Sequence, residues 1–236
     1  MCNRFENKEG IAIYKKMDDK IWNEILKNNS ILSNYVNENV KPTNYQPVLD
    51  KKNGDYNITE RSWGYWFDNG THPYFNIKTE TLLKKKDLRE KFIKSRAIVG
   101  ATSFYEWIIR VNEKGKEIKV CMKIGIPSIP EFFFPAILGE YSGEKNFTIL
   151  TINPNTAMSN VHTRMPVILS PERAKSFLND SDDNLLNYCV PLDDLIPMQI
   201  GIAPDTMLNK DALKYVSSER EKELERQQAE DTPQLF

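Results

Sequence analysis

The chain has 236 residues, of which 40% are hydrophobic and 11% aromatic, and its formal net charge is −1. This composition is typical of a globular protein with a core of its own. A charge near zero excludes the global basic field of many nucleic-acid-binding proteins, so such a partner would require a local basic patch. The three cysteines, Cys2, Cys121 and Cys189, fit neither a disulfide framework nor a zinc site, and they favour a reducing compartment.

Targeting and membrane signals are not visible in the sequence. Charges occur throughout the N-terminal region, which lacks the apolar stretch of a signal peptide. The apolar run PEFFFPAILG is short and interrupted by proline, so no membrane-spanning segment is predicted. We therefore expect a soluble, cytoplasmic protein without a membrane partner.

The first half of the chain predicts helices and short strands. Residues 17–28 have the apolar spacing of a short surface helix, and an Asn-Gly turn follows at residues 53–54. Residues 61–67, RSWGYWF, resemble an aromatic strand. Residues 79–96 are predicted as one helix, rich in lysine on its polar side.

The central part of the chain predicts paired strands. Residues 96–111 indicate a buried strand, a turn and a second strand, and a hairpin around Gly115 leads to a returning strand over residues 118–126. The segments 132–141 and 147–155 predict another pair.

A helix after the N-cap Ser170 comes next, and a weaker strand signal lies near residues 197–204. From Ser217 the chain is highly charged and nearly free of apolar residues. Many short strands with few helices, and no βαβ alternation, predict an α+β fold. We expect one domain over residues 1–216, with a mixed, mostly antiparallel sheet or barrel-like core and peripheral helices. Residues 217–236 are predicted to be a charged tail, helical or disordered.

Cys2 stands directly behind the initiator methionine in the opening MCNRF. If Met1 is removed, this residue presents a free α-amine and a thiol on adjacent carbons, which no other residue type offers together. By itself a cysteine at the second position indicates little.

Glu106 and His162 are the candidates for acid–base chemistry. Glu106 lies between aromatic residues on an apolar strand, where a buried carboxylate has a raised pKa that suits a proton donor. A glutamate on the solvent face of an edge strand is the alternative. His162 precedes an apolar run and has the residue type for proton transfer near neutrality, although a loop histidine that satisfies a turn is the simpler interpretation.

Polar and aromatic residues elsewhere suggest a nucleic-acid surface. Asn76 and Lys78 alternate on one predicted strand. The lysine-rich region of residues 84–96 is by itself typical of a solvated face, but beside Trp63 and Trp66 it equally fits a groove that follows phosphates and stacks bases.

Six blocks in order along the chain resemble the SOS response-associated peptidase (SRAP) family. They span about residues 2–205 and read MCNRF, VKPTNYQPV, RSWGYW, FNIKTET, RAIVGATSFYEW and HTRMPVIL. Four positions depart from the family pattern: Asn3 and Ser103 replace glycine, Ile77 replaces alanine, and Lys78 replaces arginine. Lys78 keeps the positive charge but loses the bidentate fork of arginine.

The resemblance implies a protein of DNA repair and the SOS response that recognises abasic sites in single-stranded DNA. In this family the N-terminal cysteine forms a covalent DNA–protein crosslink, a thiazolidine, after Met1 has been removed. The resemblance also implies autopeptidase removal of Met1 and an AP-lyase side reaction. It implies no metal or small-molecule cofactor, and we expect a monomer that associates with the nucleoid when bound to DNA.

The resemblance also implies roles for individual residues. The catalytic set is Cys2, Asn76, Glu106 and His162: Asn76 orients the Cys2 terminus, Glu106 transfers protons at the sugar hydroxyl, and His162 shuttles a proton near the 3′ phosphate. The DNA-binding candidates are Arg4, Lys78 and Arg164 for phosphates and Trp63 and Trp66 for bases. Two alternatives stay open at this point: a thiol peptidase with Cys2 as nucleophile, and a non-covalent binder of single-stranded DNA.

Overall fold

The computed structural model of the chain describes residues 3–28, 35–66 and 72–230. Within them, five strands close into a barrel in the order β10–β4–β3–β6–β9, because β9 pairs with both β6 and β10. The neighbouring strands are antiparallel except for the parallel pair β4–β10. The strand bounds are β3 (Tyr45–Lys52), β4 (Asp55–Trp63), β6 (Arg96–Ala101), β9 (Phe132–Tyr141) and β10 (Glu144–Ile152).

Two short strands extend this sheet along β10. Strand β5 (Asn76–Lys78) runs parallel to β10, and β11 (Met165–Pro166) runs antiparallel to it. Strand β10 therefore carries segments from two distant parts of the chain, FNIKTET and HTRMP, on one sheet.

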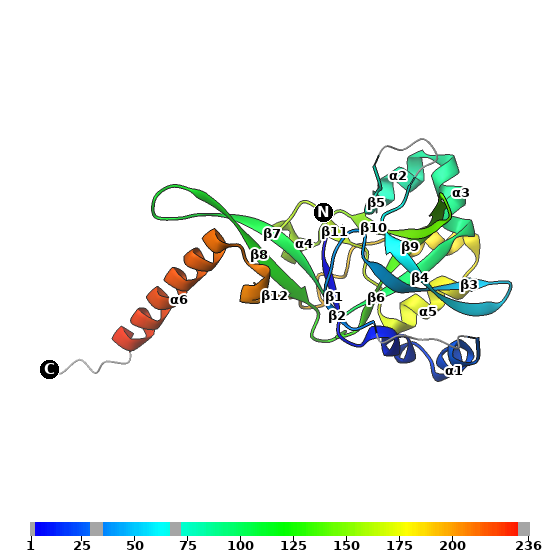
Figure 1. The fold of residues 1–236 in the computed structure, drawn as a ribbon, viewed down its shortest axis with the longest axis horizontal. Coiled ribbons are helices and arrows are strands. Elements are labelled where there is room, and N and C mark those ends of the chain that lie inside the picture. Colours follow the sequence, from blue (N-terminus) through cyan, green and yellow to red (C-terminus); the bar gives the residue numbers. More distant parts are fainter. Residues whose placement is uncertain (1–2, 29–34, 67–71, 231–236) are drawn as a thin grey trace.

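A second sheet of five strands lies beside the barrel in the order β12–β8–β7–β1–β2. Its strands are β1 (Phe5–Asn7), β2 (Asn37–Val40), β7 (Ser103–Val111), β8 (Glu117–Gly125) and β12 (Gln199–Ile202). The β7–β8 hairpin projects from the body, and Gly115 adopts a left-handed φ of 73° in its turn. Figure 1 shows this hairpin beside helix α6 (Lys210–Glu230), which extends away from the barrel.

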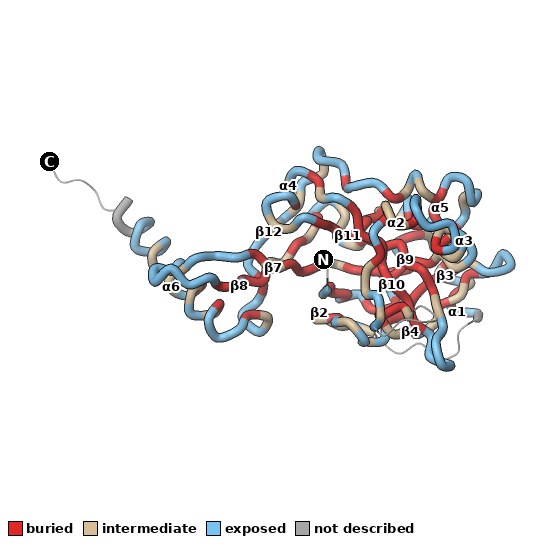
Figure 2. Tube along the Cα trace, turned by 90° about the horizontal axis from the view of Figure 1, so that it is seen from above, coloured by how far each residue is buried: buried red, intermediate tan, exposed pale blue. Residues whose placement is uncertain are grey.

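The remaining helices are short and peripheral. They are η1 (Gly10–Lys16), α1 (Asp19–Asn28), α2 (Thr79–Lys84), α3 (Lys86–Lys94), α4 (Thr156–Ser159), α5 (Pro171–Asn179), η2 (Asp182–Tyr188) and η3 (Asp205–Met207). Ser170 caps α5 as predicted, since its side chain accepts a hydrogen bond from the Arg173 amide at 3.3 Å. Figure 2 shows the buried residues gathered in the strands of the barrel, while α6 and the hairpin tip are largely exposed.

The α+β fold with a barrel-like, mostly antiparallel core is confirmed. The prediction of one helix over residues 79–96 is wrong, because the chain is extended at Lys85 (φ −109°, ψ 104°) and two helices result. At 3.6 residues per turn a continuous helix would place Leu82 and Leu88 about 120° apart around its axis. The break at Lys85 lets both leucines be buried against the barrel.

Helix α6 runs through the predicted boundary between residues 216 and 217. Its first turns bury Ala212 and Val216 in a small apolar cluster with Ile108, Ile118 and Val120 of the hairpin. The predicted tail therefore begins inside a helix, and residues 231–236 lie outside the described part of the chain.

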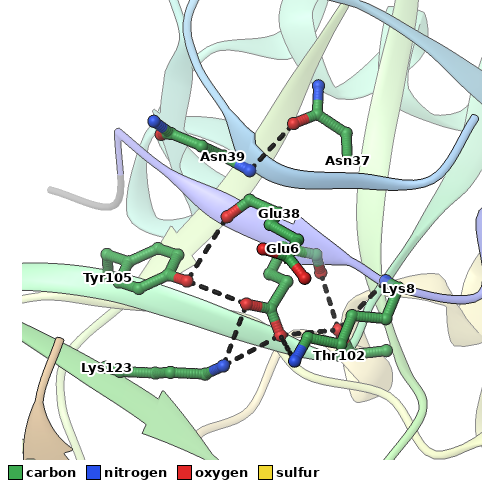
Figure 3. Close-up of polar contacts among 8 residues, drawn as sticks. All are labelled: Glu6, Lys8, Asn37, Glu38, Asn39, Thr102, Tyr105 and Lys123. Carbon is green, nitrogen blue, oxygen red and sulfur yellow. Dashed lines mark hydrogen bonds and ion pairs between the residues drawn. The ribbon is translucent and has the colours of Figure 1, made fainter. Parts of the chain in front are cut away.

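A buried carboxylate fastens β1 to β7 and β8 (Figure 3). Glu6 is 3% exposed, and its side chain accepts hydrogen bonds from Lys123 Nζ at 2.9 Å and Tyr105 Oη at 2.9 Å. Burial alone would raise the pKa of Glu6, but these hydrogen bonds and the charge of Lys123 outweigh it, and the pKa is lowered. Glu6 is therefore ionised and holds the strand that carries the N-terminal segment.

Candidate active site

A pocket of about 760 Å³ opens between the start of β1, the base of the β7–β8 hairpin and the loop after α4. Its lining combines two acid–base groups with three cations and an aromatic ring. The residues are Asn3, Arg4, Lys41, Pro42, Glu106, Trp107, Ile109, Lys119 and His162.

Glu106 lies on β7, where its backbone pairs with Met122 of β8. Its side chain faces the pocket and the residue is 2% exposed, so the alternative of a solvent-facing glutamate is excluded. Burial raises the pKa of Glu106 to about 7. The carboxyl group can therefore both give and accept a proton near neutral pH.

The register of β1 on β7 brings the N-terminal segment to Glu106. Phe5 pairs with Phe104, and the Tyr105 amide donates to the Arg4 carbonyl at 2.9 Å. The next step of an antiparallel ladder places Asn3 at the level of Glu106, and both residues line the pocket. Met1 and Cys2, the predicted nucleophile, lie outside the described residues, but a single peptide bond joins Cys2 to Asn3.

Asn76 begins β5, where it is paired with Ile149 of β10. Its Nδ2 donates a hydrogen bond to the Asn3 Oδ1 at 3.2 Å. This bond joins the sheet that contains β5 to the N-terminal segment, one residue after Cys2 in the sequence.

His162 lies in the loop between α4 and β11. Its Nδ1 accepts a hydrogen bond from the Arg164 amide at 3.0 Å, which leaves Nε2 as the nitrogen that carries hydrogen in the neutral ring. Burial lowers the pKa of His162, so the ring is neutral at pH 7. A neutral imidazole lining the same pocket as Glu106 is suited to proton transfer.

Two of the three residues predicted to contact phosphates are at least partly exposed. Arg4 lines the pocket, with its guanidinium 5.4 Å from the ring centre of Trp107 and a hydrogen bond to the Asn39 Oδ1 at 3.3 Å. Lys78 is exposed at the end of β5, and the two-residue period of a strand puts it on the same face as Asn76.

Arg164 has a different environment. It is 8% exposed and makes a bidentate ion pair with Glu80 of α2, at 2.6 and 2.8 Å, and a hydrogen bond to the Thr151 carbonyl. The hydrogen bonds from Arg164 lower the pKa of Glu80 to about 2. The guanidinium therefore ties the HTRMP loop to α2 and to β10, which is a structural task.

The two tryptophans predicted to stack on bases also lie in different environments. Trp63 is 0% exposed and packs against Phe5 and Phe147, so it has no face open to a base, and the expectation of base stacking is corrected for this residue. Trp66 is partly exposed and lies parallel to Tyr141, with 5.3 Å between ring centres. Tyr141 therefore covers one face of the Trp66 ring, and base stacking by Trp66 stays a prediction.

Lys41, Trp107 and Lys119 line the pocket but were not among the predicted site residues. Lys41 belongs to the VKPTNYQPV block and Trp107 directly follows Glu106, so their blocks already pointed to them. Lys119 had no such signal, since only its pairing with Ile109 across the hairpin brings it to the pocket.

Two further cysteines lie among the residues that the structure describes. Cys121 and Cys189 are buried free thiols, and burial raises their pKa to about 11 and about 12. No cluster of three or more His, Cys, Asp or Glu side chains suited to a metal occurs among the described residues. Within the same residues, no helix is long and apolar enough to cross a membrane.

Comparison with known proteins gives a consistent assignment. The chain is 28% identical over 210 residues to the abasic site processing protein YoqW of Bacillus subtilis (strain 168), covering 82% of this chain and 88% of that protein. It is 34% identical over 126 residues to YoaM of the same organism, covering 50% of this chain and about half, 54%, of YoaM, which is also named an abasic site processing protein. It is 24% identical over 167 residues to the abasic site processing protein YedK of Escherichia coli (strain K12), covering 65% and 72% of the two chains.

Solved structures share the fold. A phage-related protein of Bordetella bronchiseptica superposes with a TM-score of 0.64 at 20% identity, covering 86% of this chain and 95% of that chain. A protein of Bacteroides thetaiotaomicron gives the same TM-score of 0.64 at 19% identity, covering 86% and 93%. The family model described as SOS response associated peptidase (SRAP) matches residues 1–200. The chain therefore belongs to the SRAP family.

Proposed function

We propose that this protein senses abasic sites in single-stranded DNA and forms a covalent crosslink to them through Cys2 after Met1 has been removed. The observation that carries the proposal is one pocket in which Glu106, His162 and Asn3, the covalent neighbour of Cys2, line the same space. The names of three relatives, each an abasic site processing protein, support the choice of substrate.

The chemistry begins at the open form of the abasic sugar, which is an aldehyde. The α-amine of Cys2 adds to the carbonyl carbon, and loss of one water gives an imine. The thiol sulfur then adds to the imine carbon while its proton passes to the nitrogen, which closes a five-membered thiazolidine ring. An α-amine has a pKa of about 7.7–8.0, against about 10.4 for lysine, so a useful fraction is neutral and nucleophilic near pH 7.

Glu106 and His162 supply proton transfers in this proposal. With a pKa of about 7, Glu106 can protonate the departing hydroxyl and accept a proton from the attacking amine. His162, neutral and hydrogen-bonded through Nδ1, can pass a proton through Nε2. The same pair supports the AP-lyase side reaction and reversal of the crosslink.

Cations around the pocket provide the local basic patch that a nearly neutral protein needs to bind DNA. Arg4, Lys41 and Lys119 line the pocket, and Lys78 is exposed beside Asn76. The aromatic rings of Trp66 and Trp107 are suited to stack on bases next to the abasic site. We assign Arg164 to holding the HTRMP loop, through its ion pair with Glu80.

The experiment mixes the Met1-processed protein with a single-stranded oligonucleotide that carries one abasic site and separates the products on a denaturing gel. We expect a band of reduced mobility that is lost in Cys2→Ala and when one extra residue precedes Cys2. A thiol peptidase needs only the sulfur and tolerates the extra residue, and a non-covalent binder gives no such band with any variant. A band that survives both changes contradicts the thiazolidine mechanism.

A further inference from the structure

Asn3 makes a contact that a glycine cannot make. Its Oδ1 accepts a hydrogen bond from Asn76 Nδ2 at 3.2 Å, and the family pattern that this chain resembles has glycine, with no side chain, at this position. The bond joins the segment before β1 to the first residue of β5. It is therefore a link between the N-terminal segment and the sheet of β5 that depends on the side chain at position 3.

We propose that Asn3 is a positioning residue that fixes Asn76 and the N-terminal amine of Cys2 relative to Glu106. The inference rests on the proposed function, which makes Cys2 the nucleophile, and adds the residue that sets its approach. Asn3 lines the pocket but carries none of the reacting atoms in this mechanism, and it acts on them through Asn76 and through the chain.

The chain geometry explains why residue 3 controls residue 2. Consecutive Cα atoms across a trans peptide are about 3.8 Å apart, so holding Asn3 in place limits the distance over which the residue before it can move. A glycine would sample more of φ/ψ space, and replacing it with a residue that has a side chain removes part of that freedom. Holding a nucleophile near its target raises the reaction rate because less entropy is lost in the reacting complex.

The residue next to Asn3 is also held, which makes the link effective. The Arg4 carbonyl accepts from the Tyr105 amide of β7, and its guanidinium donates to Asn39 of β2. Asn3 adds a third anchor on β5. The segment directly after the nucleophile in the sequence is thus tied to strands of both sheets, with Glu106 next to Tyr105 on β7.

The Asn76 amide is oriented by the same bond. Because Nδ2 donates to Asn3, the two ends of the amide have fixed directions in the site. The resemblance to the family gives Asn76 the task of orienting the Cys2 terminus, and this task requires an amide that does not rotate. The bond thereby holds both the N-terminal segment and the Asn76 side chain in place.

The test is a double-mutant cycle of Asn3→Ala and Asn76→Ala, read out as the single-turnover rate of crosslinking at saturating abasic DNA. Because loss of the bond leaves the nucleophile less well positioned, we expect Asn3→Ala to slow crosslinking by about 2- to 10-fold. In the Asn76→Ala background the same change has no further effect, because the partner is already gone. Asn3→Asp keeps the acceptor oxygen and restores most of the rate.

Two measurements separate positioning from folding and from DNA affinity. The melting temperature of Asn3→Ala is expected to fall by no more than about 4 °C. Its non-covalent affinity for abasic DNA, measured with Cys2→Ala, is expected to change less than the crosslinking rate. Asn187→Ala, an exposed asparagine outside the pocket, is the matched control and crosslinks at the normal rate.

A normal rate in Asn3→Ala, or additive losses in the double variant, overturns the role of Asn3 and leaves the proposed function intact. If the unaltered protein forms no crosslink at all, the proposed function is wrong and this inference falls with it. The two failures are therefore distinguished by the unaltered protein on the same gel.

Discussion

At the scale of single residues, burial decides which ionisable groups of this chain can react. It raises the pKa of the Glu106 carboxyl to about 7, where the group exchanges protons near physiological pH. It raises the pKa of the Cys121 and Cys189 thiols to about 11 and about 12, so both stay protonated and unreactive. The chemistry therefore concentrates in the pocket, where Glu106 meets the segment that carries Cys2.

Glu106→Gln is expected to slow crosslinking and to stabilise the fold at alkaline pH. The pKa of Glu106 is raised in the folded state, so its contribution to the free energy of unfolding is greatest below about pH 4.5 and is lost as the pH rises towards 7. Glutamine does not ionise, so the variant keeps this part of its free energy of unfolding as the pH rises. The difference between 4.5 and about 7 corresponds to at most about 3 kcal/mol, gained by the variant between pH 5 and pH 8.

Urea unfolding at the two pH values and crosslinking on a gel measure both effects in one variant. Glu117→Gln, on the exposed end of β8, is the control and leaves both unchanged. If Glu106→Gln crosslinks slowly but needs a higher urea concentration to unfold at pH 8, misfolding is not the cause of its slow reaction. An unfolding free energy that changes equally at pH 5 and pH 8 would contradict the pKa assigned to Glu106.

At the scale of elements, three consecutive lysines are exposed at the break between α2 and α3. Lys84, Lys85 and Lys86 are all exposed where the two helices meet. Helix α2 starts directly after Lys78, so the cluster continues the positive charge that begins beside Asn76. With six residues in α2, the distance from Lys78 is about 9 Å at 1.5 Å per residue, which is within reach of neighbouring nucleotides.

Replacing these three lysines by glutamine is expected to weaken DNA binding and its dependence on salt. For single strands each neutralised phosphate contributes about −0.7 to the slope of log K against log salt, so losing three contacts reduces the slope by about 2. Affinity measured between low and physiological salt, with the Cys2→Ala protein, gives this slope.

A control triple variant changes Lys20, Lys27 and Lys52, which are exposed on α1 and at the end of β3. Figure 1 shows α1 at the edge of the molecule away from α2. The control is expected to keep the slope. Equal slopes for the two triple variants would show that the α2–α3 cluster is only a solvated face.

At the scale of the whole molecule, the projecting hairpin and α6 support each other outside the barrel. Ala212 and Val216 are fully buried against Ile108 and Val120, whereas α6 beyond residue 217 is mostly exposed. Stability therefore depends on the first turns of α6 and little on its later turns. The ion pair of Lys222 with Glu113 of the hairpin tip is exposed and adds little.

Removal of residues 219–236 is expected to shift the melting temperature by less than about 2 °C. Val216→Ala in the full chain removes two buried methyl groups and is expected to cost about 2 kcal/mol. Differential scanning calorimetry of the two proteins compares these effects. A truncation more damaging than Val216→Ala would show that the exposed part of α6 has a structural role.

The sequence by itself determined the paired strands between residues 96 and 152, the hairpin at Gly115, the cap at Ser170 and the family, because these follow from local periodicity, turn chemistry and ordered motifs. It did not predict β1, β2, β3 or β11, and it predicted a strand over residues 61–67 where β4 ends at Trp63. It also indicated Glu106, since a carboxylate between aromatic residues on an apolar strand is costly unless the fold uses it. The alternation of polar and apolar side chains along a strand indicates which residues share a face, but it does not indicate which other strand will pair with it.

Only the tertiary structure decided the rest, since it depends on contacts between distant residues. Closure of the barrel buries Trp63 behind Phe5 and Phe147, and Arg164 meets Glu80, 84 positions earlier in the chain. The register of β1 on β7 brings Asn3 to Glu106, and the hydrogen bond to Asn76 spans 73 positions. Asn3, which no sequence pattern explains, acquires its partner only when two sheets meet at the pocket.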